Sequence, residues 1–534
     1  MFRFCTLRNW RRMAVAIGLM TGAGQFASAG TPVPNPFLAA PTYAITHFDS
    51  SQSDTFPYAV TGGSRTVAPP PPLQLSQATN GPVNIMTFAS TSPNYMWGVS
   101  PTGVTYISVA NDAFTPVARA LLPGATATLQ TTLLGLLTNP IGTVAQAQAI
   151  VAQLLPTGGI SSAYGVVDNS NVLYTNSGNQ ILALALTVPA VPLLGISVVR
   201  SLNATTFLQP GENLAGVVMT YDGKLVVLGT RSVSVVDRSF TGPVHTVTLG
   251  ANESVSNSAA VDENNGIYVV SDKILRKLVW TGSALSQNAA DGAWSSAYPS
   301  GDTFPTIFGS GSGSTPTLMG FGTDPDKLVV ITDGLTRMSL LAFWRDQIPA
   351  GFTNRLAGQI QVNCGLPAAY PIQSDQSVAV NGYGAFVVNH VSAADGSTGS
   401  GVSALVDALV RGPLLPSPIG VERFAWNPLT HAWASSWARN DISSNSMVPA
   451  ISAASDLVFT NGYYQNGWGW VVTGLDWNTG ATVHQTILGT GIWGNGFYAV
   501  VQFLPDGDLL FNSILGPTRV QQPSGIINLS LIHI

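Results

Sequence analysis

Charged side chains are scarce in this chain of 534 residues. Lys, Arg, Asp and Glu together make up 9% of it, whereas an average globular domain holds roughly 25%. Long solvent-exposed helices need such side chains on their outer face, so an architecture built of them is excluded. The 55 glycines and 35 prolines instead favour short strands joined by tight turns.

Cysteine is nearly absent as well, and one of the two cysteines lies in a predicted export signal. Residues 1–29 hold four arginines, a short apolar run over 13–24 and an Ala27-Ser28-Ala29 cleavage site. We expect cleavage after Ala29 and a mature protein in the periplasm or outside the cell. The alternative is a retained anchor, but the run is shorter than the roughly 20 residues that cross a bilayer. No later run is long and apolar enough, so we expect no integral membrane segment in the mature chain.

Cleavage leaves Cys364 as the one cysteine of the mature chain. This excludes an intramolecular disulfide, a cysteine-rich zinc or iron–sulfur site and a C-x-x-C-H haem attachment. We interpret Cys364 as a small buried residue. Cleavage also removes four of 21 basic residues, which leaves 17 against 26 acidic residues and a net charge of −9. An acidic protein is a poor partner for nucleic acid, and we expect no nucleic-acid binding.

Standard catalytic motifs are missing too. The chain has no H-E-x-x-H, no Walker A lysine loop and no G-x-S-x-G elbow. Two D-x-D pairs, Asp324-Pro-Asp326 and Asp506-Gly-Asp508, lack the further oxygen ligands of an EF-hand loop. We interpret them as turn caps. The sequence therefore predicts no metal site, and it identifies neither a cofactor nor a catalytic residue.

What the chain does contain is a repeated unit, a polar turn with Asp, Asn or Gly followed by a β-rich run. Eight copies occur, at 101–107, 169–174, 221–228, 263–270, 324–331, 381–388, 454–459 and 505–511. Their spacing suits the blades of a β-propeller with insertions. We predict an all-β fold, a propeller of eight or alternatively seven four-stranded blades over residues 91–525. The alternative fold is a pair of unrelated β-sandwiches.

Three segments depart from this repeat. Residues 30–90 are rich in Pro and Ser, and their aromatic residues suggest that the segment partly docks on the propeller. Residues 125–156 repeat apolar residues at helical spacing around Asn139-Pro140, which predicts a small inserted helical hairpin. Residues 526–534 form a doubtful C-terminal tail, because the end of the chain looks like adapter read-through.

Two kinds of sequence feature resemble the quinoprotein-like (PQQ-type) β-propeller superfamily at the level of the fold. One is the stretch Trp470–Gly480, with a strand that ends in Asp476 before a Thr-Gly turn. The other is a small polar pair just before an apolar strand, at 256–258, 314–316, 374–377 and 444–446. The resemblance implies a propeller whose innermost strands open toward an axial channel. PQQ-dependent alcohol dehydrogenases of that fold carry a vicinal disulfide, which a single mature cysteine cannot form.

The polar pairs before the strands are the strongest candidates for a binding site. In the implied register, Asn257, Thr315, Asp375, Gln376 and Asn445 line one ring, and convergent polar groups are typical of ligand recognition. The alternative is that they bond to one another and hold neighbouring blades together. His47 and Asp54 join the set, since a tail that crosses the mouth of a propeller brings its side chains to that ring.

These observations predict an exported, monomeric β-propeller that binds a small molecule or a glycan at its axial mouth. One alternative is a propeller enzyme, either a lyase, a hydrolase or a quinoprotein-like oxidoreductase. A second alternative is a scaffold that binds a protein partner on a blade face. The sequence does not identify the ligand or substrate, and it leaves open whether the protein is an enzyme.

Overall fold

A computed structural model describes residues 30–69, 85–124, 135–137, 139–154, 164–301, 311–392 and 404–522. The predicted signal peptide, residues 125–134 of the predicted helical hairpin and the C-terminal tail lie outside these residues. Most of the described regular secondary structure is β-strand. Among the described helices, none is long and apolar enough to span a membrane.

The described strands form eight sheets, in chain order. The first three sheets are β3 (Thr87–Ala89), β4 (Tyr95–Val99), β5 (Gly103–Ser108) and β6 (Thr115–Leu121); β7 (Val166–Val167), β8 (Leu173–Ser177), β9 (Gln180–Leu186) and β10 (Ile196–Asn203); and β11 (Leu214–Met219), β12 (Leu225–Gly229), β13 (Ser232–Val236) and β14 (His245–Thr248). The next two are β15 (Ala260–Val261), β16 (Gly266–Val270), β17 (Ile274–Trp280), β18 (Leu285–Ser286) and β19 (Trp294–Ala297); and β20 (Thr317–Met319), β21 (Leu328–Thr332), β22 (Ser339–Trp344) and β23 (Leu356–Gln361).

The last three sheets complete the set. They are β24 (Ala379–Asn381), β25 (Gly384–Val388), β26 (Val421–Asn427) and β27 (Ala432–Arg439); β28 (Met447–Ser452), β29 (Leu457–Tyr464), β30 (Gly469–Asp476) and β31 (Thr482–Gly489), flanked by β1 (Thr55–Phe56) and β2 (Gly63–Thr66); and β32 (Gln502–Phe503), β33 (Leu509–Ser513) and β34 (Gly516–Val520). The strands β1 and β2 pair in parallel with β28 and β31, and all other pairs are antiparallel.

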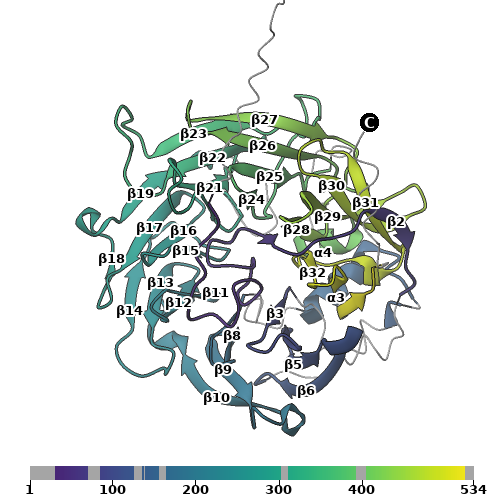
Figure 1. Cartoon of the computed structure of the whole chain (residues 1–534), viewed down its shortest axis with the longest axis horizontal. Coiled ribbons are helices and arrows are strands. Elements are labelled where there is room, and N and C mark those ends of the chain that lie inside the picture. Colours follow the sequence, from purple (N-terminus) through teal and green to yellow (C-terminus); the bar gives the residue numbers. More distant parts are fainter. Residues whose placement is uncertain are drawn as a thin grey trace, which may run out of the picture.

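Each sheet is a meander, and the sheets stand around a common centre with their first strands innermost (Figure 1). This is the architecture of a β-propeller. Second strands such as β12, β16, β21 and β25 are buried along their whole length, because both faces of a sheet pack against neighbouring sheets. The outermost strands alternate between exposed and half-buried residues instead, as β10 and β23 do.

The repeated turn of the sequence joins the first strand of a sheet to the second in seven of its eight copies. Positive φ angles at Asn171, Gly223, Asn265 and Gly507 explain the Asn and Gly there. The copy at 101–107 is the exception, because it leads from β4 into β5, the third strand of its sheet. The corresponding turn of the first sheet, between β3 and β4, lies at 90–94, where the repeated motif is absent.

The N-terminal segment 35–56 runs through the centre of the ring, visible as the purple trace in Figure 1. Its carbonyl groups accept hydrogen bonds from backbone N–H groups on the first strands of six sheets. These bonds run from Ala89 to Tyr43, Val167 to Ala44, Val261 to Ser50, Leu318 to Ser51, Val380 to Ser53 and Ile451 to Asp54, at 2.7–2.9 Å. Side chains reach the other two sheets: Asn35 donates to the Met219 carbonyl, and the Tyr43 hydroxyl donates to the Phe503 carbonyl. The segment thus contacts the innermost strand of every described sheet.

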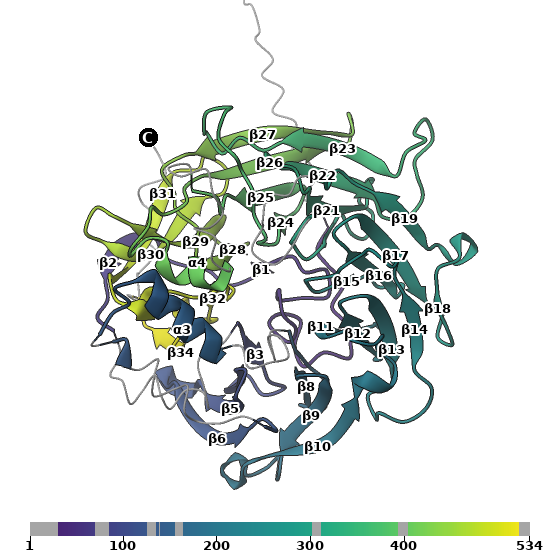
Figure 2. The same ribbon diagram turned by 180° about the vertical axis from the view of Figure 1, so that it is seen from behind.

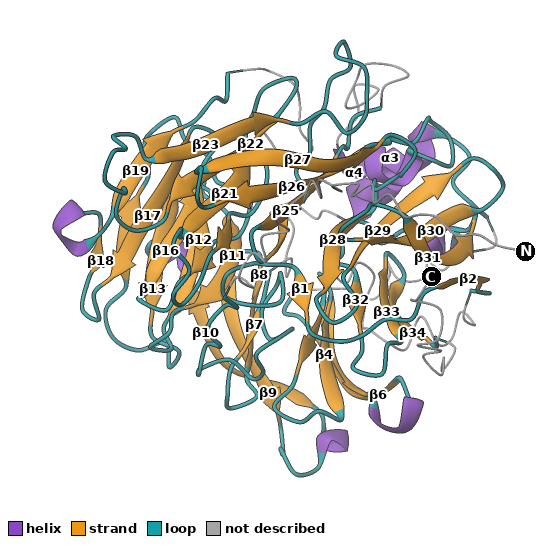
Figure 3. Ribbon diagram, turned by 45° about the horizontal axis from the view of Figure 1, so that its top comes forward, coloured by secondary structure: helices purple, strands orange, loops and turns teal. Residues whose placement is uncertain are grey.

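Two described α-helices, α3 (Val144–Leu154) and α4 (Ala404–Val410), lie side by side on the face shown in Figure 2. The helix α3 falls in the second half of the predicted hairpin and buries Ala147, Ile150 and Val151, which share one face. The helix α4 has no counterpart in the sequence predictions. Figure 3 shows both helices at the β28–β30 side of the ring. The described single turns of 3-10 helix are η1 (Ala110–Asp112), η2 (Pro192–Leu194), η3 (Ala204–Thr206), η4 (Ala289–Asp291) and η5 (Ile492–Gly494).

The central segment is held by aromatic packing, which gives a test of its importance. Phe56 is fully buried and stacks on Phe503 of the eighth sheet and Phe459 of the seventh. We expect Phe56→Ala to lower the free energy of unfolding by about 3–5 kcal/mol, since it leaves a cavity between two sheets. Urea denaturation measures this loss. Leu429→Ala, at an exposed turn, is the control and should change stability by less than about 0.5 kcal/mol; equal losses in the two variants would contradict the packing argument.

Candidate functional site

The polar residues that the sequence placed before the innermost strands all lie inside the molecule. Asn257 precedes β15, Thr315 precedes β20, Asp375 and Gln376 precede β24, and Asn445 precedes β28. Each is at most 8% exposed. We call these residues, together with the neighbouring buried side chains that they contact, the polar layer. The layer divides into a part whose hydrogen bonds are complete and a part where they are not.

The complete part begins on the N-terminal segment. Nδ1 of His47 lies 2.9 Å from Oδ1 of Asp54, and Nε2 of His47 lies 3.4 Å from the Thr315 hydroxyl. The segment brings the two residues together by a tight fold in which His47 and Asp54 both have positive φ, a conformation that costs energy in residues other than glycine. Sequence reasoning placed these side chains at the ring, and the structure brings them to Thr315.

Tyr164, just before β7, extends this chain of contacts. Its hydroxyl donates to Oδ1 of Asn257 at 3.0 Å, and its ring lies 6.1 Å from that of His47. Burial raises the pKa of Tyr164 well above its ordinary value, so the hydroxyl stays protonated as a donor. Burial also raises the pKa of Asp54, although the adjacent His47 opposes that shift. This part of the layer joins the second, fourth and fifth sheets to the central segment.

The side chain of Asn445 bonds to groups of the protein itself. Its amide nitrogen donates to the Arg411 carbonyl at the end of α4, and its oxygen accepts from the Ser443 hydroxyl and the Tyr463 N–H. Three of the four bonding positions of the amide are thereby used. Asn445 thus connects the end of α4 to the seventh sheet.

The incomplete part of the layer is centred on Asp375. Oδ1 of Asp375 accepts from Nδ1 of His390 at 2.9 Å, and His390 follows β25, the strand next to β24. Among the described residues no group bonds to Oδ2 of Asp375, to Nε2 of His390 or to either amide atom of Gln376. The three residues are 8%, 6% and 3% exposed. A buried polar atom without a partner costs about 1–3 kcal/mol, so these four atoms carry a cost that nothing among the described residues offsets.

Two serines share this property. Ser258 and Ser444 have buried hydroxyl oxygens without a partner among the described residues, and each stands next to a predicted site residue, Asn257 or Asn445. Sequence reasoning named the asparagine of each pair and missed the serine. The pattern itself, a small polar pair before a strand, carried the signal for both. Tyr164 was missed altogether, since an aromatic residue is not part of the small polar pairs that marked the other positions.

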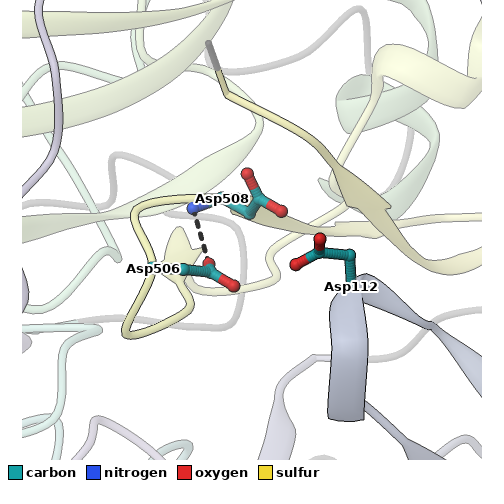
Figure 4. A group of neighbouring side chains, drawn as sticks. All are labelled: Asp112, Asp506 and Asp508. Atoms are coloured by element: carbon teal, nitrogen blue, oxygen red, sulfur yellow. Dashed lines mark hydrogen bonds between the residues drawn. The ribbon is translucent and has the colours of Figure 1, made fainter. Parts of the chain in front are cut away.

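The aspartates of the second D-x-D pair lie together with Asp112 (Figure 4). One carboxylate oxygen of each lies within 4.8 Å of those of the other two. The Arg519 side chain is 3% exposed and occupies this cluster: it contacts Asp506, lies 3.0 Å from Asp112 and lies 2.6 Å from Asp508. A guanidinium group therefore takes the place that a cation would need.

A cavity of about 510 Å³ lies beside this cluster, between residues 65–68 and 518–521. Trp493 and Phe114 also line it, but no residue of the polar layer does. Cys364 is fully buried, and burial raises the pKa of its thiol well above the ordinary value. It therefore packs as a small apolar side chain and is not a nucleophile.

Comparisons with known proteins give little beyond the architecture. No family model matches the chain. A protein of Archaeoglobus fulgidus, described only as uncharacterized, is 29% identical over 392 residues, which cover 70% of this chain and 73% of that protein. The structure of Sqt1 from Saccharomyces cerevisiae matches 64% of this chain and 76% of its own at 12% identity and a TM-score of 0.37. Virginiamycin B lyase from Staphylococcus aureus matches 57% of this chain and 76% of its own at 9% identity and a TM-score of 0.31. Because both TM-scores are below 0.5, the propeller architecture rests here on the strand pairing of this chain.

The aspartate cluster provides a test of the counter-ion assignment. Arg519→Gln should leave three carboxylates without their cation and lower the free energy of unfolding by about 1–3 kcal/mol, since two of the aspartates are well exposed. Millimolar Ca²⁺ should restore part of that loss in the variant and leave the wild type unchanged. Urea denaturation with and without Ca²⁺ measures both effects. Equal stabilisation of the wild type by Ca²⁺ would contradict the assignment.

Proposed function

We propose that this chain is an exported β-propeller of eight blades that binds a small molecule or a glycan at the polar layer. One observation carries the proposal: the bonded pair Asp375–His390 and the next residue in the chain, Gln376, are more than nine-tenths buried and hold four polar atoms without a partner among the described residues. Each of the eight sheets would be one blade, the last with three described strands. Export rests on the predicted signal, and a monomer is the expected state.

The chemistry of these atoms indicates the kind of ligand. With His390 donating from Nδ1 to Asp375, its Nε2 is an acceptor, and so are Oδ2 of Asp375 and Oε1 of Gln376. The Gln376 amide nitrogen, with its two N–H groups, is the one unpartnered donor atom of the three residues. Among the described residues no Lys or Arg side chain bonds to Asp375, so an anionic ligand would meet an uncompensated carboxylate. Three acceptors and one donor suit a neutral ligand rich in hydroxyl groups, as a sugar is.

A second candidate function is catalysis by the same residues. An aspartate that orients a histidine through Nδ1 and leaves Nε2 open is the arrangement of a general base. The pair Asp375–His390 has that arrangement at 2.9 Å. A propeller lyase or hydrolase would use Nε2 to remove a proton from the bound molecule. A quinoprotein-like oxidoreductase and a protein-binding scaffold remain alternatives without such an observation in their support.

The binding proposal is tested by the thermal stability of the protein with defined probes. We expect glucose, galactose, maltose or cellobiose at millimolar concentration to raise the Tm of the wild type by a few degrees, because a ligand that binds only the folded state stabilises it. Acetate and phosphate should have no such effect. Asp375→Asn and Gln376→Ala should abolish the rise, since each removes a bonding atom of the site.

The control variant is Gln287→Ala, which changes an exposed residue of the fourth sheet's outer loop and should respond to sugars as the wild type does. Native mass spectrometry of the purified wild type adds a second readout, in which a bound small molecule would appear as added mass that Gln376→Ala lacks. The proposal is wrong if the protein carries no such mass and if sugars shift the Tm of wild type and Gln376→Ala alike.

A further inference from the structure

The loop between β9 and β10 exposes the largest aliphatic side chains of the second sheet. Leu193 is 76% exposed and Leu194 is 60% exposed, both in the single turn η2. Exposed valines continue the surface on both sides, and Leu121 at the end of β6 adjoins it. We call this surface the apolar tip; its members are Leu121, Val188, Val191, Leu193, Leu194, Val198 and Val199. Contiguous exposed apolar groups of this kind mark a site of interaction.

Few backbone N–H groups of this loop lack a hydrogen-bond acceptor. Pro189 and Pro192 carry no N–H group. Four further N–H groups donate within the loop: Thr187 to Gly195, Val191 to Val188, Leu194 to Val191 and Gly195 to Pro192. The Thr187 hydroxyl also bonds to the Ser197 hydroxyl at 2.7 Å. Six of the nine residues from 187 to 195 therefore present no free N–H, which lowers the cost of moving the loop from water to a less polar environment.

Charged residues are scarce around the apolar tip. The strand β6, which contacts η2 and β10, carries the exposed Arg119. Residues 169–211 contain no Asp or Glu, and Arg200 is their one charged residue. Its guanidinium group is engaged with the Arg238 carbonyl and the Tyr174 hydroxyl. In a chain with an excess of acidic residues, this sector is one that a lipid surface can approach without repulsion between like charges. It offers no cluster of basic residues, so attraction to anionic lipids is not expected either.

A second copy of this chain is the less suitable occupant. The outermost strand β10 could pair with another β10, but a bulge between Val198 and Arg200 interrupts its register, and bulges are a common protection of edge strands. The most exposed leucines stand in a single turn at the end of the loop, whereas a stable dimer buries roughly 800 Å² on each partner. A short projecting turn is suited to insertion among lipid headgroups.

We propose that the apolar tip docks this protein reversibly on a zwitterionic lipid surface, with Leu193 and Leu194 inserted at the level of the headgroups. The docking depends on burial of aliphatic side chains and therefore changes little with salt concentration. It is independent of the polar layer, and loss of either property leaves the other intact.

Flotation of the full mature chain with phosphatidylcholine vesicles tests the proposal. We expect the wild type to float with the vesicles in low and high salt. The affinity of the double variant Leu193→Ser/Leu194→Ser for the vesicles should fall by a factor of about ten or more, since two inserted leucines are lost. Leu429→Ser, at an 84% exposed turn outside the apolar tip, is the matched control and should float as the wild type does. Circular dichroism checks that all three proteins are folded.

Three outcomes overturn the proposal. The first is a wild type that stays out of the vesicle fraction. The second is equal loss of flotation in Leu429→Ser and in the double variant, which would make the effect one of general surface hydrophobicity. The third is a wild-type dimer in light scattering that the double variant converts to a monomer, which would identify a second copy as the occupant.

Discussion

The hydrogen bonds from one N-terminal segment to the innermost strands of the sheets are the constraint on which this molecule depends. The sheets of a ring contact only their neighbours, yet residues 35–56 contact the first strand of all eight described sheets. The bonded residues are far apart in sequence, as Asp54 and Ile451 are. The segment therefore ties the beginning of the chain to its end and sets the sheets at fixed distances from the centre. The cost includes positive φ angles at five non-glycine residues between 43 and 54.

The same segment determines how the candidate site is divided. It supplies His47 and Asp54, whose hydrogen bonds to each other and to Thr315 complete one part of the polar layer. It supplies no side-chain partner to Asp375, His390 or Gln376, which keep unpartnered atoms among the described residues. Asp375 and Gln376 precede β24 and His390 follows β25, two paired strands of the sixth sheet, so the proposed site would have its geometry fixed before any ligand arrives.

Much of the fold could be predicted because turn chemistry and strand composition are local properties. Asp, Asn and Gly at the repeated turns indicated the short β-rich runs that follow them, and the polar pairs before strands indicated residues that are buried. The partner of Asp375 could not be predicted, since His390 is brought to it by the β24–β25 hairpin and no sequence spacing encodes that contact. The path of residues 35–56 was beyond reach for the same reason. Arg519, which neutralises three aspartates from different loops, was likewise invisible as a counter-ion.

The most direct test of this account is hydrogen exchange at the amides that donate to the central segment. Those of Val261, Leu318, Val380 and Ile451 bond to carbonyls of residues 50–54. If the segment holds the ring together, these four amides exchange only when the whole protein unfolds, and their exchange rates rise together when stability is lowered. Mass spectrometry of peptides that contain them can measure this. Fast exchange at these amides while the outer strands remain protected would show that the segment detaches on its own and would contradict the account.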